Sequence, residues 1–259
     1  MKAGGALVFF PGSAERTTKL KDRNIDMLKQ ELILRNPLRQ LGFETEDILP
    51  MGGFGAVLAH AGVGKTALLV QLALNGMLRN VNVLHVSLND PVNKVTLWYG
   101  ELFHHLAARY EATQVKQLWD TVLPHRFIMT FRVESFSVPK LEERLNDLTE
   151  QGIFSPGMMI IDGLDFDSPK PDVLVALKAL AAKSGMRCWF TVHTHRHEKS
   201  DPGALPASFA PFAPLFDLVL GLRPERADTH IELLKGTASP DAGAPLLLDP
   251  STMLIKDLP

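Results

Sequence analysis

A short segment in the first third of the chain has the residue types and the spacing needed to hold phosphate groups. Residues 59–67 read AHAGVGKTA and stand between an apolar run and a helix-like run. A glycine-rich turn leaves successive backbone N–H groups pointing into one concavity, and the helix after it adds a positive N-terminal end. Lys65 can then reach the outer phosphates, and the Thr66 hydroxyl can ligate magnesium. A glycine-rich turn that binds nothing is the alternative.

We therefore predict a nucleoside triphosphate with Mg²⁺ at this segment, which we call the phosphate loop. The segment departs from the usual spacing only at its first position, where Ala59 replaces a glycine. That change is tolerable if Ala59 lies at the end of a strand and therefore has a negative φ. The predicted nucleotide contacts are Ala59, His60, Ala61, Gly62, Val63, Gly64, Lys65, Thr66 and Ala67.

A carboxylate farther along the chain is the second predicted magnesium ligand. Residues 158–162 read MMIID, so four apolar residues deliver Asp162 at the carboxyl end of a predicted strand. Open α/β sheets place their ligand chemistry at that edge. Together with Thr66, Asp162 could hold magnesium directly or through water. Asp165 and Asp167 follow in a loop, and we expect them to be solvated or capping residues.

The elements that must position these residues form an α/β pattern. Short runs rich in apolar and β-branched residues, typical of buried parallel strands, alternate with helix-like stretches. Four later apolar runs have turns between them and no room for helices, which predicts antiparallel strands at one edge of the sheet. The predicted strands are 54–58, 81–88, 127–131, 158–162 and 187–192, then 215–222, 230–234, 246–248 and 253–255; the predicted helices after the phosphate-loop helix are 92–125, one capped by Ser137, and 172–184.

Two other segments lie outside this pattern. Residues 15–36 are polar with a partial apolar stripe, so we predict a surface helix that packs on its own domain or docks on a neighbouring subunit. We accordingly divide the chain into an N-terminal arm and helix, 1–37, and an ATPase-type domain, 38–259. Residues 195–214 are proline-rich and carry Arg196, His197 and Lys199, which predicts a mobile loop with an anionic partner.

Composition limits the class of protein. The chain has 259 residues, is 46% hydrophobic and 22% charged, and has a net charge of -2. The length fits one large α/β domain, or one domain with a small appendage. The charge excludes a strongly basic nucleic-acid binder, although a local basic loop could still contact a phosphate backbone. No apolar run approaches the roughly 20 residues of a membrane helix. The single cysteine, Cys188, excludes an intramolecular disulfide and fits a reducing compartment, so we expect a cytoplasmic protein.

Several segments resemble the RecA-like ATPases, and within them the branch of DnaB-type replicative helicases and KaiC clock proteins. In KaiC, a strand ending in two glutamates follows the phosphate-loop helix, and the segment QLALNGMLRNVNVLHVSLND is similar to it. The DnaB-type Ser-Leu-Glu motif is resembled by SLNDP. MMIIDGLDF resembles the strand with the magnesium aspartate, and TVHTHR the strand ending in Gln-x-x-Arg. FDLV and HIELLKGTASPDAGAPLLLDPSTMLI resemble the closing β-hairpin. This resemblance, over about residues 38–256, implies a RecA-like fold, ATP as the nucleotide and a homo-oligomer such as a hexameric ring.

The resemblance also suggests catalytic residues. Asn89 stands where the family has the glutamate that polarises the attacking water, and the shorter acid Asp90 is beside it. His193 takes the sensor Gln position, and Arg196 matches the Arg of the same motif. Lys235 matches a basic residue that reaches the neighbouring subunit's nucleotide, whereas Thr237 replaces the Arg that usually follows it by two.

These departures predict slow, Mg²⁺-dependent ATP hydrolysis, with Lys65, Asn89, Asp90, His193 and Lys235 as its catalytic residues. A general base contributes about 10²- to 10⁴-fold and an arginine finger about 10³- to 10⁵-fold, so losing both would leave a chain that only holds nucleotide. Two other functions stay open. One is a nucleotide-binding regulatory or assembly module without turnover, and the other is a DNA-associated motor that uses the 195–214 loop.

A cluster of histidines offers a competing role for His193. His193, His195 and His197 alternate, so on an extended strand they would share one face. With Glu198 or His230 nearby they could ligate zinc. The alternation falls where a strand gives way to a loop, which favours the sensor role.

Overall fold

Short buried strands form one sheet, and most of the candidate residues lie at the carboxyl ends of its parallel strands. In this computed structural model the described residues are 13–35, 38, 48–167, 171–195, 204–236 and 246–256, and side chains are described from residue 23 onward. The sheet has eight strands in the order β3-β2-β4-β5-β1-β6-β7-β8. Their bounds are β1 Phe54–Ala59, β2 Val83–Ser87, β3 Arg126–Thr130, β4 Met158–Asp162, β5 Arg187–His193, β6 Leu218–Glu225, β7 Asp228–Lys235 and β8 Leu246–Leu248.

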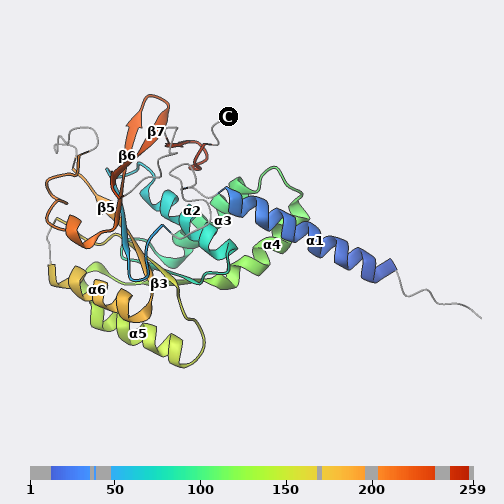
Figure 1. Ribbon diagram of the computed structural model, residues 1–259, viewed down its shortest axis with the longest axis horizontal. Coiled ribbons are helices and arrows are strands. Elements are labelled where there is room, and N and C mark those ends of the chain that lie inside the picture. Colours follow the sequence, from blue (N-terminus) through green and yellow to red (C-terminus); the bar gives the residue numbers. More distant parts are fainter. Residues whose placement is uncertain are drawn as a thin grey trace, which may run out of the picture.

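Helices cover both faces of this sheet (Figure 1). One face packs against α2 (Lys65–Leu78), α3 (Val92–Leu106), α4 (Ala112–Val122) and the end of α1 (Ser13–Leu34). The other face packs against α5 (Val138–Glu150) and α6 (Pro171–Ser184). The predicted α/β fold with a mainly parallel sheet and antiparallel edge strands is therefore confirmed. None of the described helices combines the length and the apolar character that crossing a membrane requires.

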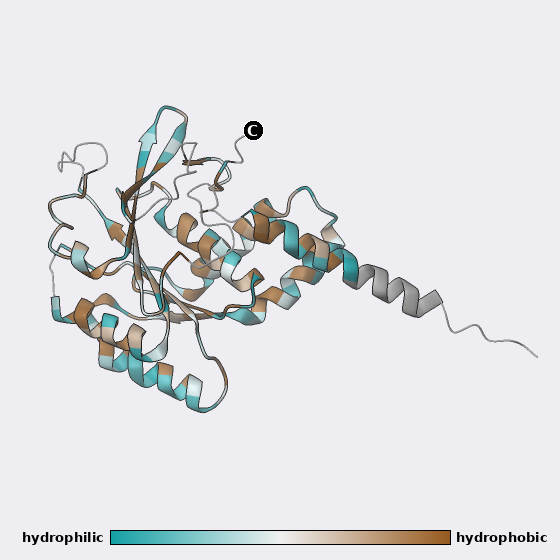
Figure 2. Ribbon diagram, viewed as in Figure 1, coloured by the Kyte–Doolittle hydropathy of each residue, from teal (hydrophilic) through white to brown (hydrophobic). Residues whose placement is uncertain are grey.

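The apolar patterns explain which helices lie deepest. Residues 67–78 of α2 are all buried, and Figure 2 shows this helix largely brown, as expected for one surrounded by core on all sides. In contrast, α5 buries only Val138, Leu141 and Leu145, and the rest of its surface is mostly teal. Ser137 is its N-cap residue as predicted, but the Ser137 side chain makes no capping hydrogen bond. The helix predicted over 92–125 is divided into α3, α4 and a short 3₁₀ turn, Leu123–His125.

The C-terminal strands differ from the prediction in two ways. β6 pairs parallel with β1, and only β7 and β8 are antiparallel. The chain from β5 to β6 passes through a 3₁₀ turn, Ala213–Leu215, on the α6 side, so it returns to the sheet as a crossover. Residues 253–255 form only an isolated bridge, from Ile255 to Leu248. This short segment bonds to β8 through the Lys256 N–H and to Asp249 through the Leu254 carbonyl, both at 2.8 Å. On its other side Gln71 accepts from the Ile255 N–H at 3.1 Å and donates to the Met253 carbonyl at 2.7 Å.

The last turns of α1 pack on the chain's own domain. Leu28 and Leu32 are buried in the same core as α2, and Lys29 donates to the side chain of Asn80. The Asn75 side chain on α2 donates to the Ile33 carbonyl at 3.1 Å. Of the two predicted packing modes, the described side chains of α1 therefore show the intramolecular one. The backbone of the first turns extends away from the domain (Figure 1). The domain boundary after residue 37 stays a prediction.

An aromatic cluster fixes the described part of the predicted 195–214 loop. Phe209, Phe212 and Phe216 pack around Phe166, with ring centroids 5.7 to 6.4 Å from it. All are buried, and Cys188 is buried in the same core. Residues 204–214 are thus anchored by side chains, contrary to the prediction of a mobile loop. Arg196, His197 and Lys199 lie outside the described residues, so their predicted anionic partner is untested.

Asp217 joins the starts of β1 and β6 across a long sequence separation. Its carboxylate accepts from the Phe54 N–H at 2.8 Å and from the Lys178 ammonium at 2.9 Å, and its own N–H donates to the Phe54 carbonyl at 2.8 Å. Burial raises the pKa of Asp217, but the Phe54 hydrogen bond and the Lys178 charge outweigh it, so the pKa lies below its ordinary value of 3.8.

We expect Asp217→Asn to lower the free energy of unfolding at neutral pH. A carboxyl group whose pKa is lower in the folded state than in the unfolded state stabilises the fold at pH values above the unfolded-state pKa. This stabilisation is lost as the pH falls through the folded-state pKa. The loss at neutral pH should be about 1 kcal/mol, because the side chain is 41% exposed and solvent screens it. Urea denaturation at neutral and acidic pH measures it. The surface control Glu142→Gln should change little, and an equal loss for Asp217→Asn at both pH values would contradict the charge-based explanation.

Candidate functional site

The phosphate loop has the backbone conformation that its glycines permit. Gly62 has φ 78° and Gly64 has φ 109°, both in the left-handed region. A Cβ atom at Gly64 would also lie 2.8 Å from Leu248 Cδ2, so β8 closes over the loop at this residue. Ala59 is the last residue of β1, pairs with His193 and is not among the described residues with positive φ. The condition under which Ala59 can replace a glycine is therefore met.

The chain places a cation and a helix end at this loop. Lys65 Nζ donates to the Ala59 and His60 carbonyls at 2.9 and 2.8 Å, so the ammonium lies against the loop. Burial lowers the pKa of Lys65 and the Asp162 carboxylate opposes this effect. No side chain caps the fully described helix α2, and its first turn contains no acidic residue. The N–H groups there are thus not matched by a protein anion, which suits a bound phosphate.

Asp162 is bonded by side chains from two other elements, Thr66 on α2 and Thr191 on β5. The Thr66 hydroxyl lies 2.9 Å from Asp162 Oδ2, and the Thr191 hydroxyl lies 2.6 Å from Asp162 Oδ1. Thr191 also accepts from the Gly163 N–H at 3.0 Å, which fixes the turn after β4. A hydroxyl and a carboxylate side by side make an oxygen-only ligand set, and this set fits Mg²⁺. The predicted pair Thr66 and Asp162 is therefore brought together.

Thr191 was not predicted from the sequence. Its only local signal is a polar residue in an apolar strand, RCWFTVH, where it is buried. A buried hydroxyl needs a partner, which could have drawn attention to it. The partner itself depends on the pairing of β4 with β5.

The turn after β2 brings Asn89 and Asp90 to the same edge. Ser87 pairs with Asp162, and its hydroxyl bonds to both the N–H and the carbonyl of Asp90. The Asn89 amide packs over Gly163, where a Cβ atom would lie 2.3 Å from Asn89 Nδ2. Asp90 Oδ1 lies 2.8 Å from Lys94 Nζ in an i,i+4 ion pair. Both residues therefore stand beside the candidate magnesium carboxylate, with Asp90 engaged by a lysine.

His85 is a buried histidine behind Asp162. Burial lowers the pKa of His85 to about 4, despite the opposing effect of the Asp162 carboxylate, so the ring is neutral at neutral pH. Its Nδ1 lies 3.1 Å from the Tyr99 hydroxyl, and its Nε2 lies 3.9 Å from Asp162 Oδ2. Among the described residues Nε2 has no hydrogen-bond partner. A neutral ring that accepts the Tyr99 hydrogen bond at Nδ1 carries its proton on Nε2, the nitrogen 3.9 Å from Asp162 Oδ2.

The end of β5 lies next to the phosphate loop. His60 Nδ1 lies 2.7 Å from the Thr194 carbonyl, and the Thr194 N–H donates to the Ala59 carbonyl at 3.1 Å. His193, the predicted sensor, is exposed at this edge. Partial burial, and next the Lys65 charge, lower its pKa below the ordinary value of 6.5. Arg196, the other sensor residue, lies outside the described residues.

Lys235 ends β7, where it pairs with Val219, and Val219 pairs with Ala56 near the start of β1. Lys235 therefore lies at the opposite end of the strands from the phosphate loop of its own chain. Its ammonium donates to the Ala213 carbonyl of the same chain at 2.6 Å. The structure contains one chain, so its predicted contact with a neighbouring nucleotide is untested. Thr237 lies outside the described residues.

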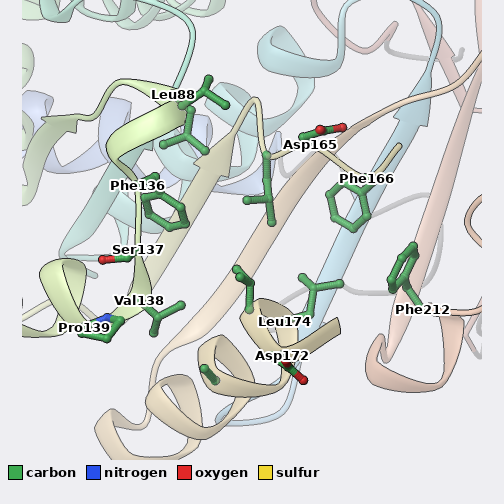
Figure 3. Close-up of a pocket in the computed structure, with 14 residues that line it drawn as sticks. Leu88, Phe136, Ser137, Val138, Pro139, Asp165, Phe166, Asp172, Leu174 and Phe212 are labelled. Atoms are coloured by element: carbon green, nitrogen blue, oxygen red, sulfur yellow. The ribbon is translucent and has the colours of Figure 1, made fainter. Parts of the chain in front are cut away.

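A cavity of about 460 Å³ lies on the face of the sheet that α5 and α6 cover. Figure 3 shows Leu88, Phe136, Phe166, Leu174 and Phe212 around it. The wall is mainly apolar, and no residue of the phosphate loop belongs to it. It therefore does not suit the phosphates of a nucleotide, and the loop remains the candidate site.

The family model described as an AAA domain matches residues 15–167, which include the phosphate loop, Asn89, Asp90 and Asp162. No curated protein matches the chain.

Proposed function

We propose that this chain, which belongs to the AAA domain family of P-loop ATPases, binds ATP with Mg²⁺ at the phosphate loop and hydrolyses it slowly. The observation that carries this proposal is the convergence of Thr66 and Asp162, 2.9 Å apart, beside the Lys65 ammonium and the uncapped start of α2. These groups come from α2 and β4, and together they match the charge of a triphosphate and the ligand preference of magnesium.

Each residue has a definite role in this proposal. The loop N–H groups and Lys65 hold the phosphates, and Thr66 and Asp162 hold the metal. Magnesium, when bound, neutralises the charge that develops on the phosphates. Thr191 and His85 orient the Asp162 carboxylate from either side. Asp90 accepts the proton of the attacking water, and Asn89 orients that water by hydrogen bonding.

Slow turnover follows from the residues at the end of β2. Asn89 cannot accept a proton at neutral pH, and Asp90 is shorter than glutamate and paired with Lys94. The same observation favours the second candidate, a module that holds nucleotide without hydrolysing it. Equilibrium binding of ATP with Mg²⁺ and single-turnover cleavage separate the two. Cleavage that stays at the uncatalysed rate while ATP binds would support the second candidate, whereas no binding of ATP would overturn both.

We further place the chain in the RecA-like branch of DnaB-type and KaiC-type ATPases and infer a homo-oligomer, with a hexameric ring as one form. Support comes from the segment order described above and from the hairpin of β6 and β7, which stands at the edge of the domain (Figure 1). In such an assembly Lys235 would act on the nucleotide of a neighbouring subunit. To do so its ammonium must leave the Ala213 carbonyl.

Lys235→Ala is expected to lower turnover only where the protein is assembled. A cation supplied by a neighbour can act only when that neighbour is present, so wild type and variant should have equal turnover at dilutions that give monomers. Turnover measured against protein concentration, with the assembly state followed by light scattering, tests this. Lys183→Ala, which removes an exposed lysine paired with Glu142, is the control. An equal loss at all concentrations would contradict a role between subunits.

A further inference from the structure

We propose that Asp167, His193 and His195 form a binding site for a divalent transition-metal ion of the zinc class, separate from the magnesium site. Each of the three residues offers one ligand atom, and these atoms all lie within 4.8 Å of one another. His195 Nε2 and Asp167 Oδ1 are 2.8 Å apart. The rings of His193 and His195 have centroids 5.3 Å apart and are nearly perpendicular. Three ligand atoms this close can surround one ion and leave a fourth position open to water.

Strand order brings the three ligands together. Asp167 follows β4, whereas His193 ends β5 and His195 lies two residues later, so alternation keeps the two rings on one side. β4 and β5 are parallel neighbours, so their carboxyl ends meet at one edge of the sheet. The sequence predicted that His193 and His195 could share a metal. Asp167 was not among the predicted metal ligands. Of the other predicted ligands, His230 lies on β7 beside Glu225. His197 and Glu198 lie outside the described residues.

The backbone that carries these ligands is anchored. Phe166, directly before Asp167, is buried against Phe190, Phe209 and Phe212. Thr194, between the two histidines, is buried and bonded to Ala59. All three ligand side chains are themselves exposed, so an ion can enter from solvent. Only side-chain rotation is needed to replace the hydrogen bond between His195 and Asp167 with two bonds to a metal.

The ligand types identify the class of ion. Imidazole nitrogen suits zinc and its transition-metal neighbours, whereas magnesium prefers oxygen alone. Thr66 and Asp162 offer oxygen only, and the new cluster offers two nitrogens and one carboxylate, so the two sites select different ions. The clusters are nevertheless close along the sheet edge, because His193 pairs with Ala59 of the phosphate loop. An ion bound to His193 would withdraw this side chain from a nucleotide.

Cobalt(II) is the probe for this site, because a tetrahedral Co²⁺ complex absorbs visible light far more strongly than hydrated Co²⁺. Full-length protein without a histidine tag is stripped with a chelator and titrated with Co²⁺ in the absence of nucleotide, then with Zn²⁺. We expect one ion per chain, an intense tetrahedral spectrum and displacement by Zn²⁺. Asp167→Asn, His193→Ala and His195→Ala should each weaken binding at least about tenfold. His230→Ala, which removes a histidine that also lies near a carboxylate, should leave the affinity unchanged.

The site assignment fails if wild type does not saturate, gives only an octahedral spectrum, or binds Co²⁺ as tightly after the three substitutions as before. It also fails if His230→Ala weakens binding as much as they do. All three positions are exposed, so the variants should keep their fold, which circular dichroism checks. No nucleotide is present, so this result is independent of whether ATP binds at the phosphate loop.

Discussion

Lys65→Ala is expected to remove most ATP binding. Lys65 is the cation at the centre of the loop, and its ammonium already lies between the loop carbonyls of Ala59 and His60. Deleting one partner of a desolvated, hydrogen-bonded charge pair costs about 2–5 kcal/mol, so the dissociation constant should rise at least about 30-fold. Isothermal titration calorimetry with ATP and Mg²⁺ measures the change.

Two further variants make this experiment specific. Lys183→Ala removes an exposed lysine of the same charge and should bind ATP like wild type. Thr66→Ala removes only the metal-binding hydroxyl, so it should weaken binding in Mg²⁺ more than in a chelator, whereas Lys65→Ala should weaken both. Unchanged affinity in Lys65→Ala would rule out the phosphate loop as the nucleotide site.

The second large effect concerns hydrolysis, where Asp90→Asn and Asn89→Glu should act in opposite directions. Asp90→Asn keeps the shape of the side chain but removes the acid that accepts a proton, so single-turnover cleavage should slow about 10²-fold or more. Asn89→Glu puts a proton acceptor next to Asp162, where the Asn89 amide now packs over Gly163. It should therefore accelerate cleavage.

Single-turnover cleavage of ATP, with nucleotide bound in advance, isolates the chemical step from binding. Asp120→Asn, an exposed acid on α4, is the control and should cleave at the wild-type rate. A wild-type rate in Asp90→Asn would show that Asp90 is not the base. A large acceleration in Asn89→Glu would show that the natural chain is set to retain ATP rather than to hydrolyse it.

The sequence by itself determined the features that depend on neighbouring residues. The phosphate loop needs glycine where φ is positive, and Gly62 and Gly64 stand there because a side chain would be strained. β4 has the bounds that the run MMIID predicts, because a strand buried on both faces must be apolar throughout. Asp162 then follows at the carboxyl end, so the pairing with Thr66 could be predicted without knowing the path of the chain.

The tertiary structure alone decided several other contacts between distant residues. The direction of β6 depends on how the chain crosses from β5, and an apolar run looks the same in either direction. Three other contacts depend on the strand order β4-β5-β1-β6. They are the bond of Asp217 to the start of β1, the bond of Thr191 to Asp162, and the cluster of Asp167 with His193 and His195. Side chains at these positions carry no local signal of their partners, because hydrophobic periodicity fixes which face a residue occupies but not which strand lies next to it.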